Sequence, residues 1–450
     1  MTAEIAVMNK EAIALAADSA ITIGGPGGEE KILTSGNKIF TASKYEPVAV
    51  MIYGNATLMG VPWEPIIKLY REQLGQKPFK TIEEYSNDLI KFLSEHKQLF
   101  PEDYSDRYFA AHIASYFQGV IRHRLFKSLG IKPEVPAPTK TADEWAKAFD
   151  PILKTEKEVW RSTAFLPGAS AADAKSSRRK YQKLFAKIIE VSFEKIPLLP
   201  RIKRALADIA SYASVKCPDP LRWRSATGVV VAGFGRDEIF PALRAFSVHG
   251  VFNGRLNHRI NDKIGIGFDH EAVVVPFAQD DMVYAFMEGV DRSYLTETNR
   301  ATERLVRDYP SVVIDRASFL DDAQKSKLKV LFSSVAPSVF SDYLKRLEKF
   351  RFENFAQEIV QLVSFLPKHE LATLAESMVN LTTLRRKVSL GAETVGGPID
   401  VALISKAEGL IWVKRKHYFD PALNHQFFAN YYRQGSHEEK NSNSTVGNSS

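Results

Sequence analysis

The chain has 450 residues, of which 45% are hydrophobic and 25% are charged, and these fractions are typical of a folded globular protein. Its net charge of +7 is small for this length, so a nucleic-acid-binding protein is not expected. No apolar run approaches the roughly 18 residues of a membrane span, and a single cysteine, Cys217, excludes an intrachain disulfide. We therefore expect a cytoplasmic protein that does not contact a membrane.

The first predicted elements are two short strands within residues 3–17, joined by a turn at Asn9-Lys10-Glu11. The second strand ends at Asp18, so the hairpin should return this carboxylate to the chain start, beside Thr2. Because methionine is normally removed before a small residue, we expect the mature chain to begin at Thr2. Its free α-amino group would titrate at about 7.7–8.0 and could act as the base for the hydroxyl of the same residue.

Two further features could complete a nucleophilic site. Lys38 lies in the apolar-flanked run 37–40 and can supply a positive charge, which Asp18 can hold as an ion pair. Gly54 ends the apolar run 47–54, where a predicted strand stops. A glycine at this point lets a substrate carbonyl approach the backbone N–H that would bind an oxyanion.

About the first 75 residues resemble the start of a proteasome β-subunit, a member of the N-terminal nucleophile (Ntn) hydrolase superfamily. The matching pieces are Thr2, Leu15-Ala16-Ala17-Asp18, Lys38-Ile39-Phe40 and Gly54. The stretch between Asp18 and Lys38 is longer here and carries a glycine-rich loop, residues 24–28. The resemblance implies that Thr2 is nucleophile and base, that Asp18 and Lys38 form the charge pair, and that Gly54 is the oxyanion donor.

The same resemblance implies an α+β fold, a four-layer αββα sandwich, interrupted here by two helical insertions. It implies a threonine protease or amidase related to bacterial proteasomes, acting on peptide or other amide bonds. It also implies a homo-oligomer, either a dimer or a ring, with an unfoldase or another protein as a candidate partner. The sequence has no phosphate-binding loop, no HExxH motif and no paired cysteines, so no cofactor or metal is expected.

Helical periodicity follows the first strands, with helices expected from about residue 62, at 81–97 and at 106–128. Residues 129–222 then depart from the family. They hold a proline-rich segment, 132–139, and predicted helices at 142–149, 181–193 and 202–213. The segment Lys175–Arg204 is rich in basic residues, which is more typical of a solvated helix face than of a site for an acidic partner.

Strands of a second sheet are predicted at 227–233, 239–248, 251–257 and 262–267. In the family a serine that supports the nucleophile follows these strands. The matching place here, 277–281, has no serine, and Gln279 or Asp280 could take over its hydrogen bonds.

A second insertion runs to about residue 365 and shows helical spacing at 341–363. A helix to about 387 and a strand hairpin at 399–405 and 409–416 should close the core. The loop before this hairpin lacks the family's aspartate and serine in register. Glu393 is the nearest acid and is the candidate for their supporting role.

The expected organisation is therefore one core built from three separate segments. The core segments are 1–128, 223–291 and 366–433, the insertions are 129–222 and 292–365, and 434–450 is a disordered tail. Two other functions fit the same pattern. One is a small-molecule amidase whose insertions form a lid, and the other is a degenerate Ntn shell that serves as a scaffold or sensor.

Overall fold

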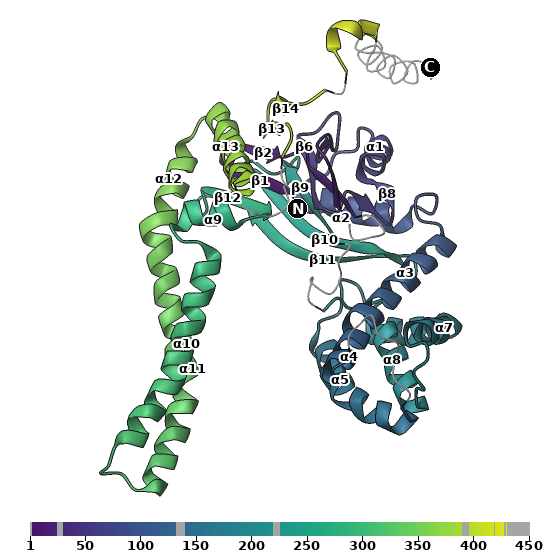
Figure 1. Cartoon of the computed structure of the whole chain (residues 1–450). Coiled ribbons are helices and arrows are strands. Elements are labelled where there is room, and N and C mark those ends of the chain that lie inside the picture. The colour runs from purple at the N-terminus through teal and green to yellow at the C-terminus, as the bar shows by residue number, and fades with distance from the viewer. Residues whose placement is uncertain are drawn as a thin grey trace.

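The computed structural model describes residues 2–24, 30–131, 140–218, 226–388, 396–417, 419–426 and 429. The chain is a mixed α/β protein of antiparallel sheets and helices (Figure 1). Several predicted features lie outside the described residues: most of the glycine-rich loop, the segment 132–139, Glu393 and the tail.

Two five-stranded sheets form the centre of the molecule. The first sheet has the order β12-β1-β2-β13-β14, formed by Ala272–Ala278, Ala3–Asn9, Ala12–Ala17, Asp400–Ser405 and Gly409–Lys414. The second has the order β11-β10-β9-β6-β5, formed by Arg255–Gly265, Ala242–Phe252, Thr227–Gly233, Val48–Gly54 and Ile39–Thr41. Two small hairpins pair β3 (Ile21–Gly24) with β4 (Glu30–Leu33) and β7 (Thr57–Leu58) with β8 (Val61–Pro62).

The inner faces of the two sheets share one hydrophobic core. Because successive strand side chains point to opposite faces, Ala6 and Met8 of β1 lie on the same side as Glu4. Both belong to a cluster that also contains Met51 of β6 and Val230 of β9. The register of β1 therefore decides which of its side chains lie between the sheets.

Helices cover the outer face of each sheet. The opposite side of β1, including Ile5 and Val7, packs with α9 (Asp281–Glu288), α12 (Gln357–Phe365) and α13 (Lys368–Lys387). The second sheet packs against α1 (Trp63–Leu74) and α2 (Ile82–Glu95). Every residue of β1 and β2 is buried, which explains why these strands read as nearly continuous apolar runs.

The first helical insertion has its own core, and because this core includes Phe109 and Phe117, the insertion begins before the predicted residue 129. It contains α3 (Glu102–Tyr116), a π-helix (Phe117–Arg122), α4 (His123–Ser128), α5 (Ala142–Ser162), α6 (Ala171–Lys180), α7 (Gln182–Ser192) and α8 (Pro200–Tyr212). The predicted helix at 142–149 is correct in position but too short, because α5 continues past Pro151. Trp145, Phe149, Leu153 and Trp160 keep the helical spacing of buried residues beyond that proline.

The prediction of separate strands at 251–257 and 262–267 is wrong. The turn lies at Asn253-Gly254, both with positive φ, and β11 then runs without interruption to Gly265. Gly250, which falls between the strands predicted at 239–248 and 251–257, lies within β10 at an irregularity in its pairing with β11, between Val248 and Gly250. The sequence analysis also missed β12, which pairs with β1 along its whole length.

The second insertion is a helical hairpin that we call the arm, α10 (Arg292–Arg316) and α11 (Asp322–Arg351). It extends away from the sheets as the green pair of helices in Figure 1, and a short π-helix (Phe352–Ala356) joins it to α12. The sequence predicted helix in only part of this region. Among the described residues, none of the helices combines the length and apolarity that crossing a membrane requires.

Candidate functional site

Thr2 lies directly before β1, at the edge of the space between the two sheets. Its carbonyl oxygen accepts a hydrogen bond of 3.2 Å from the Gln279 N–H, which continues the pairing of β1 with β12. Thr2 is 3% exposed and Glu4 is 2% exposed. By the alternation of the strand, both side chains belong to the face of β1 that points toward the second sheet.

Asp18 holds the start of the chain in place. One of its carboxylate oxygens accepts the Ala3 N–H at 3.0 Å, and the other accepts the N–H groups of Gly396 at 3.0 Å and Ala20 at 3.2 Å. The β1–β2 hairpin brings Asp18 to this position, as the sequence predicted. Asp18 therefore fixes the backbone next to Thr2, in addition to binding Lys38.

Lys38 reaches this site from the second sheet, because it directly precedes β5. Its ammonium group forms ion pairs with Asp18 and with Glu4, the latter at 3.0 Å, and the residue is 4% exposed. Two carboxylates of the first sheet thus hold one cation of the second. The structure brings together the predicted Thr2, Asp18 and Lys38, and it adds a second acid.

The sequence analysis missed Glu4. The pKa of Glu4 is raised to about 7, because burial and the charge of Asp18 together outweigh the opposing effect of Lys38. One signal could have revealed this residue, since Glu4 is the only charged side chain in the strand AEIAVMN. A lone acid in a strand buried on both faces requires a partner.

Gly54, the last residue of β6, faces the Thr2 hydroxyl. Its N–H donates to Thr2 Oγ1 at 3.4 Å, and its φ of +81° lies in the left-handed region that favours glycine. A Cβ at this position would also lie 3.2 Å from the Ala226 carbonyl oxygen. The short β7–β8 hairpin lies between Gly54 and α1, which begins at Trp63, close to the expected residue 62.

The three predicted supporting residues have different surroundings. The side-chain oxygen of Gln279 accepts a hydrogen bond of 2.5 Å from Arg386 of α13, while its backbone contacts Thr2. Asp280 forms an ion pair of 3.0 Å with Arg292 at the base of the arm. Glu393 is outside the described residues, so its proposed role stays a prediction.

Metal-binding chemistry is not apparent in the described part of the chain, where no group of three or more His, Cys, Asp and Glu side chains could hold an ion. The two carboxylates nearest Thr2, Glu4 and Asp18, are both engaged by Lys38. The site therefore offers a hydroxyl, a cation between two acids, and a backbone donor.

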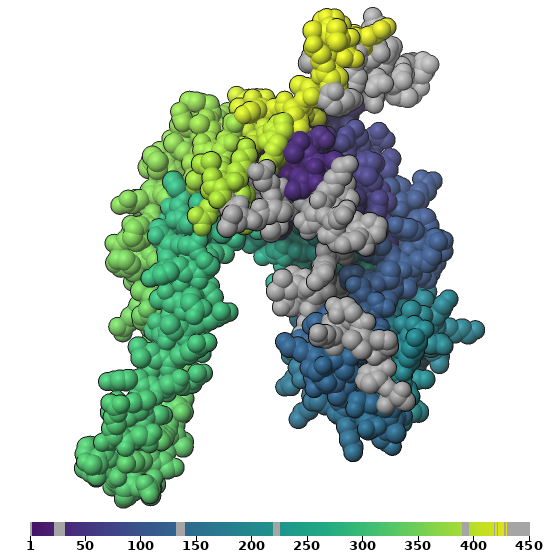
Figure 2. Space-filling model, viewed as in Figure 1, coloured from purple at the N-terminus to yellow at the C-terminus, as the bar shows by residue number. Residues whose placement is uncertain are grey.

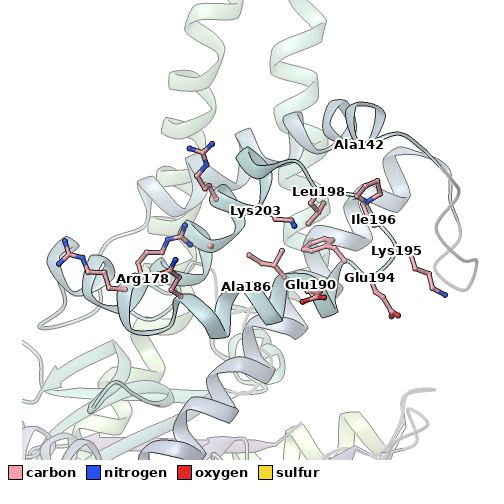
Figure 3. A pocket seen from close by; sticks show the side chains of 16 residues that line it. Ala142, Arg178, Ala186, Glu190, Glu194, Lys195, Ile196, Leu198 and Lys203 are labelled. Atoms are coloured by element: carbon pink, nitrogen blue, oxygen red, sulfur yellow. The ribbon is translucent and has the colours of Figure 1, made fainter.

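A cavity of about 970 Å³ lies elsewhere, in the first insertion (Figure 3). It is lined by basic side chains that include Arg178 and Lys203, and by Glu190 of α7 and Glu194, which follows this helix. The basic segment noted in the sequence thus contributes to this cavity. None of its lining residues belongs to the Thr2 site, so the cavity is not the candidate active site.

A buried Cys217–His249 pair also lies away from Thr2, with 3.4 Å between Cys217 Sγ and His249 Nε2. The pKa of His249 is lowered to about 4, mainly by burial, with smaller effects of the same sign from Arg259 and His258. The imidazole is therefore neutral near pH 7 and cannot stabilise a thiolate as a cation would. We interpret this pair as part of the packing between the first insertion and β10.

This burial predicts an acid-dependent loss of stability. The unfolded chain binds a proton at His249 below pH 6.5, but the folded chain does so only near pH 4. The contribution of His249 to the free energy of unfolding is therefore complete above pH 6.5 and is lost as the pH falls toward 4. Relative to His249→Asn, the free energy of unfolding should fall by up to about 1.4 kcal/mol per pH unit between pH 6.5 and 4. Urea unfolding across this range measures the difference. The exposed His425→Asn control should show the wild-type pH dependence, and an equal dependence in both variants would contradict the prediction.

Comparison with known proteins provides little further information. The chain matches no family in a scan of protein families, and it matches no curated protein. A solved structure of an Anbu (Gly-1) mutant from Hyphomicrobium sp. strain MC1 is similar over 100% of both chains, with 10% sequence identity and a TM-score of 0.27. A similarity this low does not establish a shared fold.

Proposed function

We propose that this chain is an N-terminal threonine hydrolase of peptide or other amide bonds, with the four-layer αββα arrangement of an Ntn hydrolase. The observation that carries the proposal is the meeting of Thr2, Asp18, Lys38 and Gly54 from four separate segments. The sequence resemblance to proteasome β-subunits assigns a role to each of these positions. The two sheets with helices on their outer faces are compatible with that fold.

The proposed reaction begins after removal of Met1, which frees the α-amino group of Thr2. The hydroxyl oxygen attacks the substrate carbonyl, and its proton passes through a water to that amine. The Gly54 N–H stabilises the negative charge on the carbonyl oxygen. The amine then returns the proton to the leaving nitrogen as the C–N bond breaks. Water hydrolyses the resulting ester by the same route, which releases the acid and restores Thr2.

Lys38 and its two acids set the electrostatics of this step. The positive charge of Lys38 favours the oxyanion and the ionised hydroxyl, and Asp18 holds Lys38 in place. The Thr2 hydroxyl has one hydrogen to donate and lone pairs to accept. It accepts a hydrogen bond of 3.4 Å from the Gly54 N–H, which helps to orient the nucleophile.

The scaffold or sensor alternative is favoured by two specific observations. The family's supporting serine is absent, and the side chain of Gln279, one of the two residues that could take its place, is already hydrogen-bonded to Arg386. A small-molecule amidase shares the mechanism above and differs in substrate. Comparing peptide libraries with simple amides as substrates separates these two enzyme functions.

The deciding experiment is intact-mass spectrometry before and after treatment with an electrophile that must bond both the hydroxyl and the amine of an N-terminal threonine. We expect a starting mass without methionine and then one adduct. Thr2→Ser should retain the adduct and Thr2→Ala should lose it. Retained methionine, or a free Thr2 that takes no adduct, would overturn the proposed hydrolase and favour the scaffold.

A further inference from the structure

We propose that the arm is an interface through which two copies of this chain associate, side by side and antiparallel, to form a four-helix bundle. Each helix of the arm carries an exposed apolar stripe at positions i, i+4 and i+8, which lie near one another on a helix. The stripes are Leu305, Tyr309 and Val313 of α10, and Leu331, Val335 and Val339 of α11. These six side chains are between 43% and 62% exposed.

Little of the chain itself covers the arm. None of the 30 residues of α11, all of which are described, is buried, and α10 buries only Ile314. Figure 2 shows the arm standing clear of the sheets and of the first insertion in this view. A pair of helices that packs only against each other has little core, so a further partner that covers its apolar side chains would stabilise it.

The middle of the arm lacks the charges that a solvated helix carries. Residues 330–341, VLFSSVAPSVFS, contain no charged side chain over about three helical turns. Nearer the tip of the arm, residues 309–314 of α10, YPSVVI, are also uncharged. The small residues in the first run, such as Ser334 and Ala336, permit close approach of another helix. This composition indicates a surface that is buried in the assembled protein.

The amount of exposed surface suits a second copy. At about half exposure, the six stripe side chains together leave roughly 500 Å² of apolar surface, so two copies would bury about 1,000 Å². This reaches the size of a specific interface before any other contact is counted. A twofold axis places the same stripes of both copies against each other, so no second complementary surface is needed.

Antiparallel packing of the arms keeps the two bodies far apart. Packed helices lie about 8–10 Å apart, and the bodies at the base of the arms are much wider than this. Antiparallel arms place the two bodies at opposite ends of the bundle. The stripe of α11 lies near the middle of that helix, so reversing one arm still brings stripe to stripe.

The first test measures the mass in solution by light scattering at about 1–100 µM, because dimer formation depends on protomer concentration. We expect twice the chain mass of 50.5 kDa. Leu331→Glu/Val335→Glu should halve the mass while leaving the helical circular dichroism unchanged. Ile239→Glu, at a residue that is 78% exposed outside the arm, is the control and should remain dimeric. A monomeric wild type, or a double variant of unchanged mass, would overturn the proposal.

Disulfide crosslinking tests the orientation. Ser334→Cys, near the proposed twofold axis, should crosslink to its copy under oxidation. Ser326→Cys lies 8 residues nearer the tip, so its two copies would be about 24 Å apart in antiparallel arms and should not crosslink. Crosslinking through position 326 would instead require parallel arms. The native Cys217 is 9% exposed in both variants and provides the same background.

Two controls separate this interface from other occupants and from the proposed hydrolase. Thr2→Ala should dimerise like the wild type, because Thr2 is not part of the arm. A monomeric wild type that sediments with phosphatidylcholine vesicles, and loses this binding in Leu331→Glu/Val335→Glu, would assign the stripes to a lipid surface. That result would overturn the dimer interface without affecting the proposed reaction at Thr2.

Discussion

Replacing Lys38 with methionine is expected to lower the free energy of unfolding by about 3–5 kcal/mol, because it leaves two buried acids without their cation. Glu4 and Asp18 both form ion pairs with Lys38, and all three side chains are almost completely buried. The same change should abolish the reaction of Thr2 with the electrophile, since the site loses its only ammonium group in the described structure. Chemical unfolding and intact-mass labelling measure the two effects.

The control for this experiment is Lys68→Met. Lys68 forms an exposed i,i+4 ion pair of 2.7 Å with Glu64, and removing such a pair should cost less than about 1 kcal/mol. Adding Glu4→Gln to Lys38→Met should recover part of the lost stability, because one of the two stranded charges is removed. If Lys38→Met were as stable as Lys68→Met, the buried ion-pair cluster would not exist in solution.

Glu4→Gln is expected to stabilise the protein progressively as the pH rises. The pKa of Glu4 is raised from 4.5 to about 7, so the folded state holds its proton more tightly than the unfolded state between these values. The stabilising contribution of this proton is complete below pH 4.5 and is lost as the pH rises through 7. Glutamine resembles the protonated acid at every pH. The variant should match the wild type near pH 4 and exceed it by about 3 kcal/mol at pH 8.

The measurement is the difference in unfolding free energy between wild type and Glu4→Gln from pH 4 to 8. Glu11→Gln, at an exposed position, should show no such trend. The labelling rate of Thr2 should also lose an inflection near pH 7 in Glu4→Gln and keep the one due to the α-amine at about 7.7–8.0. A pH-independent difference would show that Glu4 is ionised, or protonated, throughout the range.

Glu4 and His249 act in opposite directions below neutral pH. Between about pH 4.5 and 6.5, falling pH favours folding through Glu4 and opposes it through His249. The wild type should therefore depend on pH less than either single variant does. Measuring the pH dependence of the wild type and of both single variants therefore tests the two buried groups together.

The local features of the site could be predicted from the sequence. A tight hairpin and the period-2 alternation of a strand place Asp18 next to the residues after Thr2, with no information from distant segments. Lys38 and Gly54 were identified by their resemblance to a family pattern, and their positions beside Asp18 and Thr2 agree with that pattern. The helices were also predicted in most places, because a buried helix face repeats apolar residues every three or four positions.

Contacts between distant segments could not be predicted in the same way. The sequence does not show that Glu4 of the first sheet meets Lys38 of the second, because this depends on how the sheets face each other. The hydrogen bond from Arg386 to Gln279 joins residues 107 positions apart, and it exists only because α13 lies over the first sheet. The break predicted between 239–248 and 251–257 is a pairing irregularity within β10, which depends on the partner strand β11.

The sequence by itself determined the local geometry at Thr2, the apolar strands and the periodicity of the helices, since each depends on neighbouring residues. Only the tertiary structure decided the net charge around Thr2 and the exposure of the arm. Both depend on which surfaces are removed from water when separate segments pack. Burial next to Lys38 and Asp18 makes Glu4 an acid that titrates near neutral pH. Lack of burial leaves the apolar stripes of the arm in contact with solvent.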